Sequence, residues 1–425
     1  MSQPLPGKPN SAATVLFASL IGTTIEFFDF YIYATAAVLV FPKLFFPASD
    51  AAAATLQSLA TFALAFLARP IGSAVFGHFG DRVGRKVTLV AALLTMGLST
   101  VIIGMLPTYA TIGTLAPALL ALCRFGQGLG LGGEWGGAVL LATENAPPGK
   151  RAWYGMFPQL GAPLGFFLSG GTFLLLAQSL TEAEFFSYGW RIPFLASALL
   201  VIVGMYVRLS LTETPAFKEV LAKKETVKIP ALTVLRDHTR ELVLGTLIAM
   251  ATFVLFYLMT VFTLGWGTSH LGFTRTQFLI MQLFAVLFFG LTIPLSAVLA
   301  DRHGRRETMI WVSVAIAAFG LALAPLFGSG STPMVVAFLA IGLGLMGMTY
   351  GPLGTLLSEM FPAEVRYTGA SLTFNLAGIL GASLAPYAAT WLATNYGLQY
   401  VGFYLTAAAA ISLVALLMTR RTAAA

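Results

Sequence analysis

Five charged residues interrupt long apolar stretches in the first half of the chain: Glu26, Asp29, Arg69, Arg124 and Glu134. A charge near the centre of a bilayer costs at least ~2.5–3.5 kcal/mol on insertion scales, so such residues usually pair with one another or line a transport pathway. The second half carries only uncharged polar side chains at comparable depth, such as Tyr257 and Asn375. We therefore expect any proton-binding carboxylate to belong to the first half.

Helical spacing groups these residues on shared faces. Glu26, Asp29 and Tyr33 recur at i, i+3 and i+7 and therefore lie on one face of a helix. Arg124 shares a face of another helix with Gln127 and Trp135. Our hypothesis is that Asp29 pairs with Arg124 and takes up a proton when a conformational change breaks the pair. A permanent structural ion pair is the alternative.

Each of the other polar residues in these stretches has more than one possible role. Glu26 either shares the proton role or binds substrate, or it pairs with Arg69 for structural reasons. Arg69 either binds a substrate carboxylate or joins an ion pair between packed helices. For Glu134 we favour a structural or gating contact over a proton site, and Gln159 either faces a cavity or packs in the core.

Composition points to the elements that must position these residues. The 425-residue chain is 57% hydrophobic and only 10% charged, against about 25% charged in an average soluble domain. Its apolar runs are long enough to cross a bilayer as helices, and they lack the alternating polarity of membrane β-strands. The sequence therefore predicts an all-α membrane protein.

Twelve spanning helices are expected. Their predicted ranges are 14–41, 54–79, 87–106, 113–143, 152–180, 190–211, 240–268, 274–300, 307–328, 333–358, 367–394 and 398–418. We divide the chain into a tail (1–13), a six-helix bundle (14–211), a linker (212–239), a second bundle (240–418) and a tail (419–425).

Basic residues are distributed unequally over the predicted loops. If both termini are cytoplasmic, only Lys43, Arg191 and Arg275 fall on the opposite side, while the other loop lysines and arginines lie in the cytoplasm. This asymmetry follows the positive-inside rule and accounts for the net charge of +7 without a nucleic-acid partner.

The two halves repeat each other. "GHFGDRVGRK" (77–86) and "AVLADRHGRR" (297–306) are 220 residues apart, and a second pair of loops repeats Glu, Pro and Arg at an offset of 215. In that pair Glu144 and Arg151 correspond to Glu359 and Arg366. Two duplicated six-helix halves around a midplane site are typical of secondary transporters.

The first of these loops resembles the signature loop of the major facilitator superfamily. "IEFFDFYIY", "ARPIG", "RFGQGLGLGGEWGG" and "GWRIPF" further resemble the metabolite:proton symporter family, whose members take up α-ketoglutarate, citrate, shikimate, or proline and betaine. The second loop departs from the pattern at Ala297, where the first has Gly77.

The resemblance implies a twelve-helix major facilitator fold and roles for further residues. The helices at 14–41 and 113–143 would line a central cavity. The substrate cavity would include Arg69, Tyr33, Gln127, Trp135, Gln159, Tyr257 and Asn375. A latch on the cytoplasmic face would consist of Asp81, Arg82, Gly84 and Arg85, with Asp301, Arg302 and Arg305 as its counterpart in the second half.

The glycines of "RFGQGLGLGGEWGG" match a dinucleotide-binding pattern, yet they lie in the middle of an apolar run instead of between a strand and a helix. Gly126, Gly130, Gly133 and Gly137 instead form a ridge roughly opposite Arg124, and such ridges allow membrane helices to pack closely.

These features together predict a proton-coupled symporter that imports a small organic acid by alternating access. Uptake of a zwitterion such as proline or betaine, or export of a metabolite or drug, remains the alternative. We expect no catalysis, no cofactor and no metal, because nucleotide-binding and metal-ligand motifs are missing and Cys123 is the single cysteine. The expected partners are a small metabolite, protons and lipid, for a monomer in the bacterial inner membrane.

Overall fold

The computed structural model describes residues 12–47, 51–83, 85–210, 230–362 and 365–419, with the side chains of 12, 15, 77–83, 85–89, 141, 144, 208 and 210 left undescribed. The predicted twelve spans are present. In the first half they are formed by α1 (Ala12–Leu39), α3 (Ala51–Val83), α4 (Arg85–Met105), α6 (Leu115–Gly132) with α7 (Trp135–Glu144), α8 (Arg151–Ser179) and α10 (Arg191–Ser210). Short helices α2 (Phe41–Leu44), α5 (Tyr109–Ile112), α9 (Glu182–Glu184) and the π-helix η1 (Phe185–Gly189) connect them.

The second half repeats this order after α12 (Pro230–Asp237), a short helix at the end of the predicted linker. Its spans are α13 (Thr239–Tyr257) with η2 (Leu258–Phe262) and α14 (Thr263–Ser269), α15 (Arg275–His303), α16 (Arg305–Gly320) with η3 (Leu323–Phe327), α17 (Thr332–Glu359), α18 (Arg366–Ala377) with η4 (Gly378–Ser383) and α19 (Ala385–Asn395), and α20 (Leu398–Met418).

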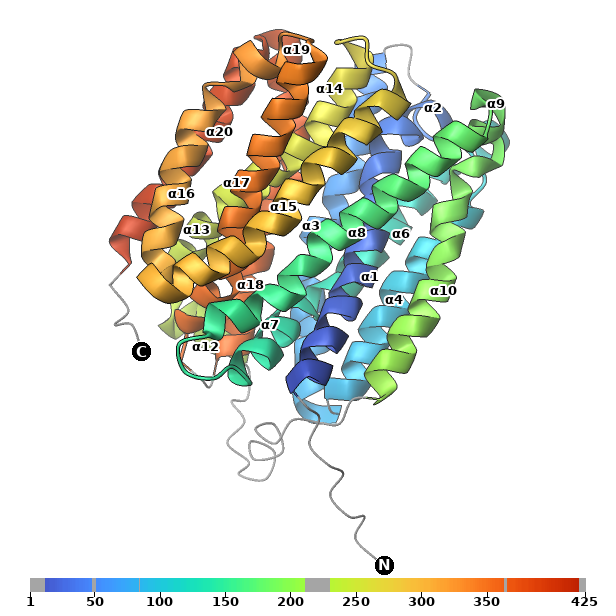
Figure 1. Ribbon diagram of the computed structural model, residues 1–425. Helices are drawn as coiled ribbons and strands as arrows, with labels where there is room; N and C mark the ends of the chain where they lie inside the picture. The colour runs from blue at the N-terminus through green and yellow to red at the C-terminus, as the bar shows by residue number, and fades with distance from the viewer. Residues whose placement is uncertain (1–11, 48–50, 84, 211–229, 363–364, 420–425) are drawn as a thin grey trace, which may run out of the picture.

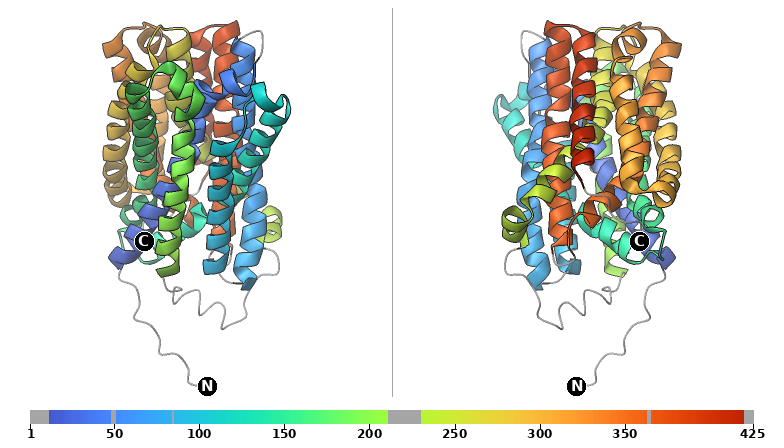
Figure 2. Two further views of the ribbon diagram at one scale, coloured as in Figure 1. Left: turned by 90° about the vertical axis from the view of Figure 1, so that its right-hand side faces the viewer. Right: turned by 90° about the vertical axis from the view of Figure 1, so that its left-hand side faces the viewer.

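The helices run side by side along one axis, as all three views show (Figures 1 and 2). α1 begins and α20 ends at the same end of the bundle, which we call the terminal face; α2, α9 and α14 lie at the opposite face. The two halves meet along α8 and α15, and along α3 with α18 and η4. Residues between these helix pairs are therefore the ones that both halves can reach.

Length and hydropathy alone identify nine spans among the described residues, or ten if the bent pair around α9, η1 and α10 counts as one. α16 is only 16 residues long, and the apolar part of α4 with described side chains is the equally short Val90–Met105, so both fall below the length required of a span. They are recognised as spans because they occupy equivalent places in the two halves.

The fourth span differs from its prediction. The sequence predicts one helix over 113–143, but the structure divides it into α6 and α7 at Gly133 and Glu134. The carbonyls of Gly132 and Gly133 accept hydrogen bonds from side chains of other helices at this point. Arg124 contacts Phe62 and Gln127, whereas Trp135, beyond the break, contacts Gln159 and Phe374.

The glycines of this span pack against three helices. A side chain at Gly126 or Gly130 would strike Ser99 or Met96 of α4, whereas Gly133 lies against Phe76 of α3. Gly137 lies beyond the break and faces Tyr367 of α18. The ridge therefore permits close packing at each position, but its last member contacts the second half because of the break.

Candidate functional site

Asp29 lies on α1 and is fully buried. Its Oδ1 accepts a 2.6 Å hydrogen bond from the Ser197 hydroxyl of α10, and the Thr100 hydroxyl of α4 is a second interacting group. Neither hydroxyl was identified from the sequence, because serines and threonines inside apolar helices usually bond their own backbone. Their effect is to surround the carboxyl with hydroxyl groups instead of a cation.

Arg124 is also fully buried, on α6. Its Nε donates to the Phe62 carbonyl at 3.3 Å and its Nη1 to Gln127 Oε1 at 3.0 Å. The guanidinium lies 4.3 Å from the ring centre of Phe30 and 4.1 Å from that of Tyr33. These contacts hold the guanidinium among groups of the first half and use two of its five N–H donors.

In this conformation Asp29 and Arg124 do not form the direct pair that the hypothesis requires in one of its two states. The carboxyl interacts with hydroxyls from α4 and α10, and the guanidinium with a carbonyl, an amide and aromatic rings. Helical spacing relates residues within one helix and could not give the distance between groups on two different helices.

Arg69 on α3 lies on the other side of the same aromatic cluster. Its guanidinium is 4.6 Å from the ring centre of Phe30 and 4.5 Å from that of Phe66. Phe30 thus contacts both buried arginines. Tyr257 packs against Phe66, with ring centres 5.5 Å apart, so the second half covers this aromatic cluster.

Three further candidates are buried near these residues. Glu26 lies one turn before Asp29 on α1, and Glu134 lies at the break between α6 and α7. Tyr33 packs its ring on Arg124, and within the described chain its hydroxyl has no hydrogen-bond partner. The proposed roles of Glu26 and Glu134 stay predictions.

Trp135, Gln159 and Asn375 lie between the halves. Trp135 donates to Gln159 Oε1 at 3.0 Å and stacks on Phe374 of α18, with ring centres 3.7 Å apart. Gln159 in turn donates to the Tyr350 carbonyl of α17 at 3.0 Å. In this conformation these residues join the two halves.

Asn375 of α18 donates to Ser73 Oγ of α3 at 2.8 Å and to the Gly132 carbonyl at 3.4 Å. Tyr367, also on α18, donates from its hydroxyl to the Gly133 carbonyl at 2.5 Å. Two side chains of the second half thus bind the carbonyls freed by the break in the fourth span.

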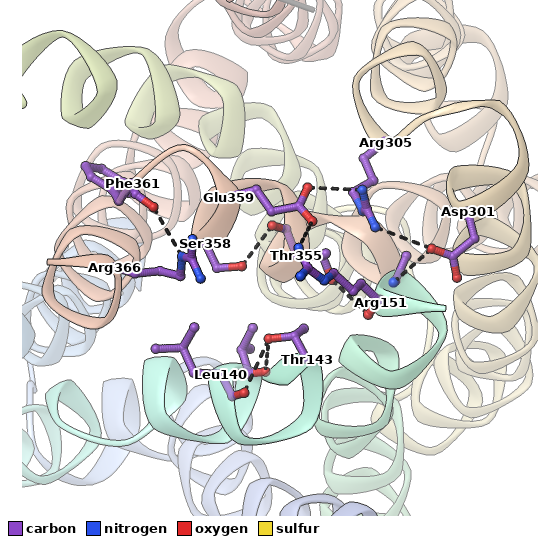
Figure 3. A network of polar contacts seen from close by, with 12 residues as sticks. Leu140, Thr143, Arg151, Asp301, Arg305, Thr355, Ser358, Glu359, Phe361 and Arg366 are labelled. Atoms are coloured by element: carbon purple, nitrogen blue, oxygen red, sulfur yellow. Dashed lines mark hydrogen bonds and ion pairs between the residues drawn. The ribbon is translucent and has the colours of Figure 1, made fainter. Parts of the chain in front are cut away.

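At the terminal face a polar network connects α15 and α17 to the start of α8 (Figure 3). Asp301 accepts from the backbone N–H groups of Ala152 at 3.0 Å and Trp153 at 2.9 Å. A carboxylate at a helix N-terminus binds otherwise unpaired N–H groups and meets the positive end of the helix dipole. Asp301 therefore contacts the other half directly.

Arg305 and Glu359 complete this network. Arg305 lies 3.6 Å from Asp301 and 3.1 Å from Glu359, and Glu359 also lies 3.7 Å from Arg151 of the first half. Sequence reasoning placed Glu359 and Arg151 in the repeated loops without assigning them to the latch. Arg302 is exposed, Gly84 lies outside the described residues, and so do the side chains of Asp81, Arg82 and Arg85.

The contacts at the opposite face are of a different kind. Arg275, at the start of α15, lies 3.9 Å from the ring centre of Phe185, which follows α8. Lys43 lies 4.4 Å from the ring of Phe186 and 3.5 Å from Glu182. The α8–α15 pair is thus joined across the halves at both ends. Among the described residues, no cluster of three or more metal-ligating side chains occurs.

Comparisons with known proteins give a consistent result. The sequence model of the sugar (and other) transporter family matches residues 14–422. The chain is 63% identical to the inner membrane metabolite transport protein YhjE of Escherichia coli, over 97% of this chain and 95% of that protein.

More distant relatives have named substrates. The shikimate transporter of Escherichia coli is 36% identical over 96% of this chain and 94% of its own, and the proline/betaine transporter of Salmonella typhimurium is 32% identical over 98% and 84%. The crystal structure of a D-xylose-proton symporter superposes with a TM-score of 0.73 at 19% identity, covering 96% of this chain and 97% of that one. That likeness concerns the fold.

Proposed function

We propose that this chain is a proton-coupled symporter for a small organic acid. It belongs to the sugar (and other) transporter family, within the major facilitator superfamily. It is therefore a membrane transporter of metabolites and not an enzyme. In this proposal Asp29 binds the proton and the arginines attract the substrate carboxylate. The proton gradient supplies the energy, and no cofactor takes part.

The observation that carries the proposal is the arrangement of buried charge around Phe30. Arg69 and Arg124 both contact this ring, and both are nearly or fully inaccessible to solvent. An arginine stacked on aromatic rings still offers planar N–H donors to a carboxylate. Within the described chain, Nε of Arg69 and one Nη of Arg124 have no hydrogen-bond partner, so each arginine retains donors for an anion.

Asp29 supports the proton role because its contacts are neutral hydroxyls. Asp29 keeps at least one hydrogen bond, with Ser197, whether its carboxyl group is ionised or protonated. Substrate and proton would then enter from one side, and the halves would rock about the site. We place the protein in a bacterial inner membrane, as a monomer with cytoplasmic termini.

A zwitterionic substrate is the second candidate. Buried groups of both signs, Glu26 and Asp29 against Arg69 and Arg124, would suit a molecule that carries separate charges. The 32% identity to a proline/betaine transporter supports this possibility.

The test uses purified protein in liposomes that contain a pH-sensitive dye. Shikimate, citrate, α-ketoglutarate, proline and glycine betaine are added in turn, without an imposed gradient. We expect one of the carboxylates to acidify the lumen in protein-containing liposomes and not in empty ones. Uptake of a labelled compound without acidification would make the protein a facilitator, and a response to proline or betaine alone would select the second candidate.

A further inference from the structure

We propose that Asp29 and Arg124 communicate through a hydrogen-bond relay formed by Thr100 and Gln127, with Thr100 as the positioning residue that senses the protonation of Asp29. This inference rests on the proposed function, because it requires Asp29 to bind the transported proton. It replaces the direct pair predicted from the sequence with a route that stays within the first half.

The relay consists of two hydrogen bonds that lead from Arg124 to Thr100 and a further contact between Thr100 and Asp29. Arg124 Nη1 donates to Gln127 Oε1 at 3.0 Å, and Gln127 Nε2 donates to Thr100 Oγ1 at 2.8 Å. The Thr100 hydroxyl interacts with the Asp29 carboxyl. Thr100 and Arg124 are fully buried and Gln127 nearly so, so water does not compete for these bonds.

Thr100 can take two arrangements because a hydroxyl has one hydrogen. In this structure the hydroxyl donates to the Met96 carbonyl of its own helix at 3.0 Å. Oδ2 of Asp29 has no hydrogen-bond partner among the described residues. The carboxyl therefore has an acceptor site that the same hydrogen can reach when Thr100 turns away from Met96.

Protonation of Asp29 selects between these arrangements. An ionised carboxylate is a stronger acceptor than a carbonyl, so it draws the Thr100 hydrogen. When a proton binds to the carboxyl, the hydrogen returns to Met96 and no other covalent bond changes. Turning the hydroxyl moves the lone pair that accepts from Gln127. The amide follows, and its Oε1 shifts against Arg124.

The surroundings of Asp29 leave few other routes to Arg124. Glu26 is the charged neighbour on the same helix, and α10 contributes the hydroxyl of Ser197. α8 packs on α1 through Gly161 and Gly165, which have no side chain to titrate. The relay through α4 is thus the polar connection from Asp29 toward α6 that the described residues provide.

The experiment is infrared difference spectroscopy on the whole protein in lipid, with a change of pH and no substrate. The carboxyl band of Asp29 is assigned by its loss in Asp29→Asn, and the guanidinium band of Arg124 by its change in Arg124→Lys. In the wild type we expect the guanidinium band to shift together with the appearance of the carboxyl band.

Thr100→Val removes the hydroxyl at nearly constant volume, and we expect it to abolish the guanidinium shift while the carboxyl band remains. Thr100→Ser retains the hydroxyl and should retain the shift. Gln127→Met interrupts the relay at the next link and should also abolish it, which gives a second test if Thr100→Val does not fold.

Thr246→Val is the matched control. Thr246 is a buried threonine in the second half that donates to Leu242 of its own helix at 2.8 Å, as Thr100 does to Met96. This variant should behave like the wild type. A guanidinium shift that persists in both Thr100→Val and Gln127→Met overturns the relay alone, whereas a wild type without a titrating Asp29 band overturns the proposed proton site and the relay with it.

Discussion

In the first half, α6 buries Arg124 against three aromatic rings, whereas α17, at the equivalent place in the second half, buries uncharged groups such as Thr349 and Tyr350. Arg69, Glu26 and Asp29 are likewise buried in the first half. The second half contributes rings and amides that reach across, including Tyr257 and Asn375.

This difference separates two tasks. In the proposed mechanism, charged groups that belong to one half keep their mutual distances while the halves move, so their chemistry does not depend on the conformation. The neutral half can then cover or uncover the charges without breaking a buried ion pair, which is costly to separate. The division predicts that mutations in the two halves have different consequences.

The largest effect is expected for Asp29→Asn. The amide cannot release a proton, so uphill uptake should fall by about tenfold or more, a change that corresponds to ~1.4 kcal/mol. Exchange of labelled for unlabelled substrate across the membrane should continue. Uphill uptake and counterflow are measured in the same liposomes, and undiminished uphill uptake would show that the proton binds elsewhere.

Arg69→Lys comes next. Lysine retains the charge but loses the planar donors that stack on Phe30 and Phe66. Because lysine keeps the charge but cannot offer two parallel donors, we expect about fivefold weaker binding of the transported acid, from the loss of one hydrogen bond worth ~1 kcal/mol. Titration of the purified variant by calorimetry measures this affinity, and unchanged binding would make Arg69 a packing residue.

Gln282→Leu is the contrasting change in the second half. Gln282 donates to the carbonyls of Met259 at 3.1 Å and Thr260 at 2.7 Å, where α13 passes into η2. Its loss removes one donor from each of these buried carbonyls, although the Thr263 hydroxyl still donates to that of Met259 at 2.7 Å, and should cost ~0.5–1.5 kcal/mol of stability. Thermal unfolding should occur at a lower temperature while substrate affinity stays the same. A large loss of affinity would contradict the division between the halves.

Glu359→Gln tests the contact between the halves. The variant loses its ion pairs with Arg305 and Arg151, which are partly accessible to solvent and together contribute about 1 kcal/mol. The terminal face should open about fivefold more often. Spin labels placed on α8 and α15 report the distance between the halves. An unaltered distance distribution would indicate that Asp301 and the contacts of Trp135 hold the halves together instead.

Arg275→Gln should have the smallest effect. The contact with Phe185 is a single cation–π interaction of ~0.5–1 kcal/mol near the surface. We expect a two- to fivefold change in opening of the opposite face, detected with the same kind of labels placed at that end. An effect larger than that of Glu359→Gln would mean that the contact at the opposite face holds the halves together more strongly than the contact at the terminal face.

Much of the fold followed from periodicity and repetition. The predicted span 152–180 is observed as Arg151–Ser179, and 333–358 as Thr332–Glu359, because apolar runs in a bilayer have few alternatives to a helix. The break at Gly133 was not predictable in this way. Its stability comes from Tyr367 and Asn375, which lie more than two hundred residues further along the chain.

The sequence predicted the charged residues of the site, but not the residues that they contact. Asp29, Arg69 and Arg124 were evident because charges in apolar runs are rare. Thr100 and Ser197 were not, because hydroxyl residues are common in membrane helices and only distance distinguishes one that meets a carboxyl. Glu359 was visible as part of a repeat, but its partners come from two different helices.

The two carbonyls at the break in the fourth span have a consequence for the speed of transport. As long as α18 lies against them, Tyr367 and Asn375 satisfy Gly133 and Gly132. When the halves separate at this face, both acceptors must find water or recover the backbone donors of a continuous helix. Each opening therefore requires these two carbonyls to exchange their partners, and a turnover rate that depends on this exchange would respond to substitution of Gly136 or Gly137 by alanine, because these glycines lie against Ser371 and Tyr367 of α18.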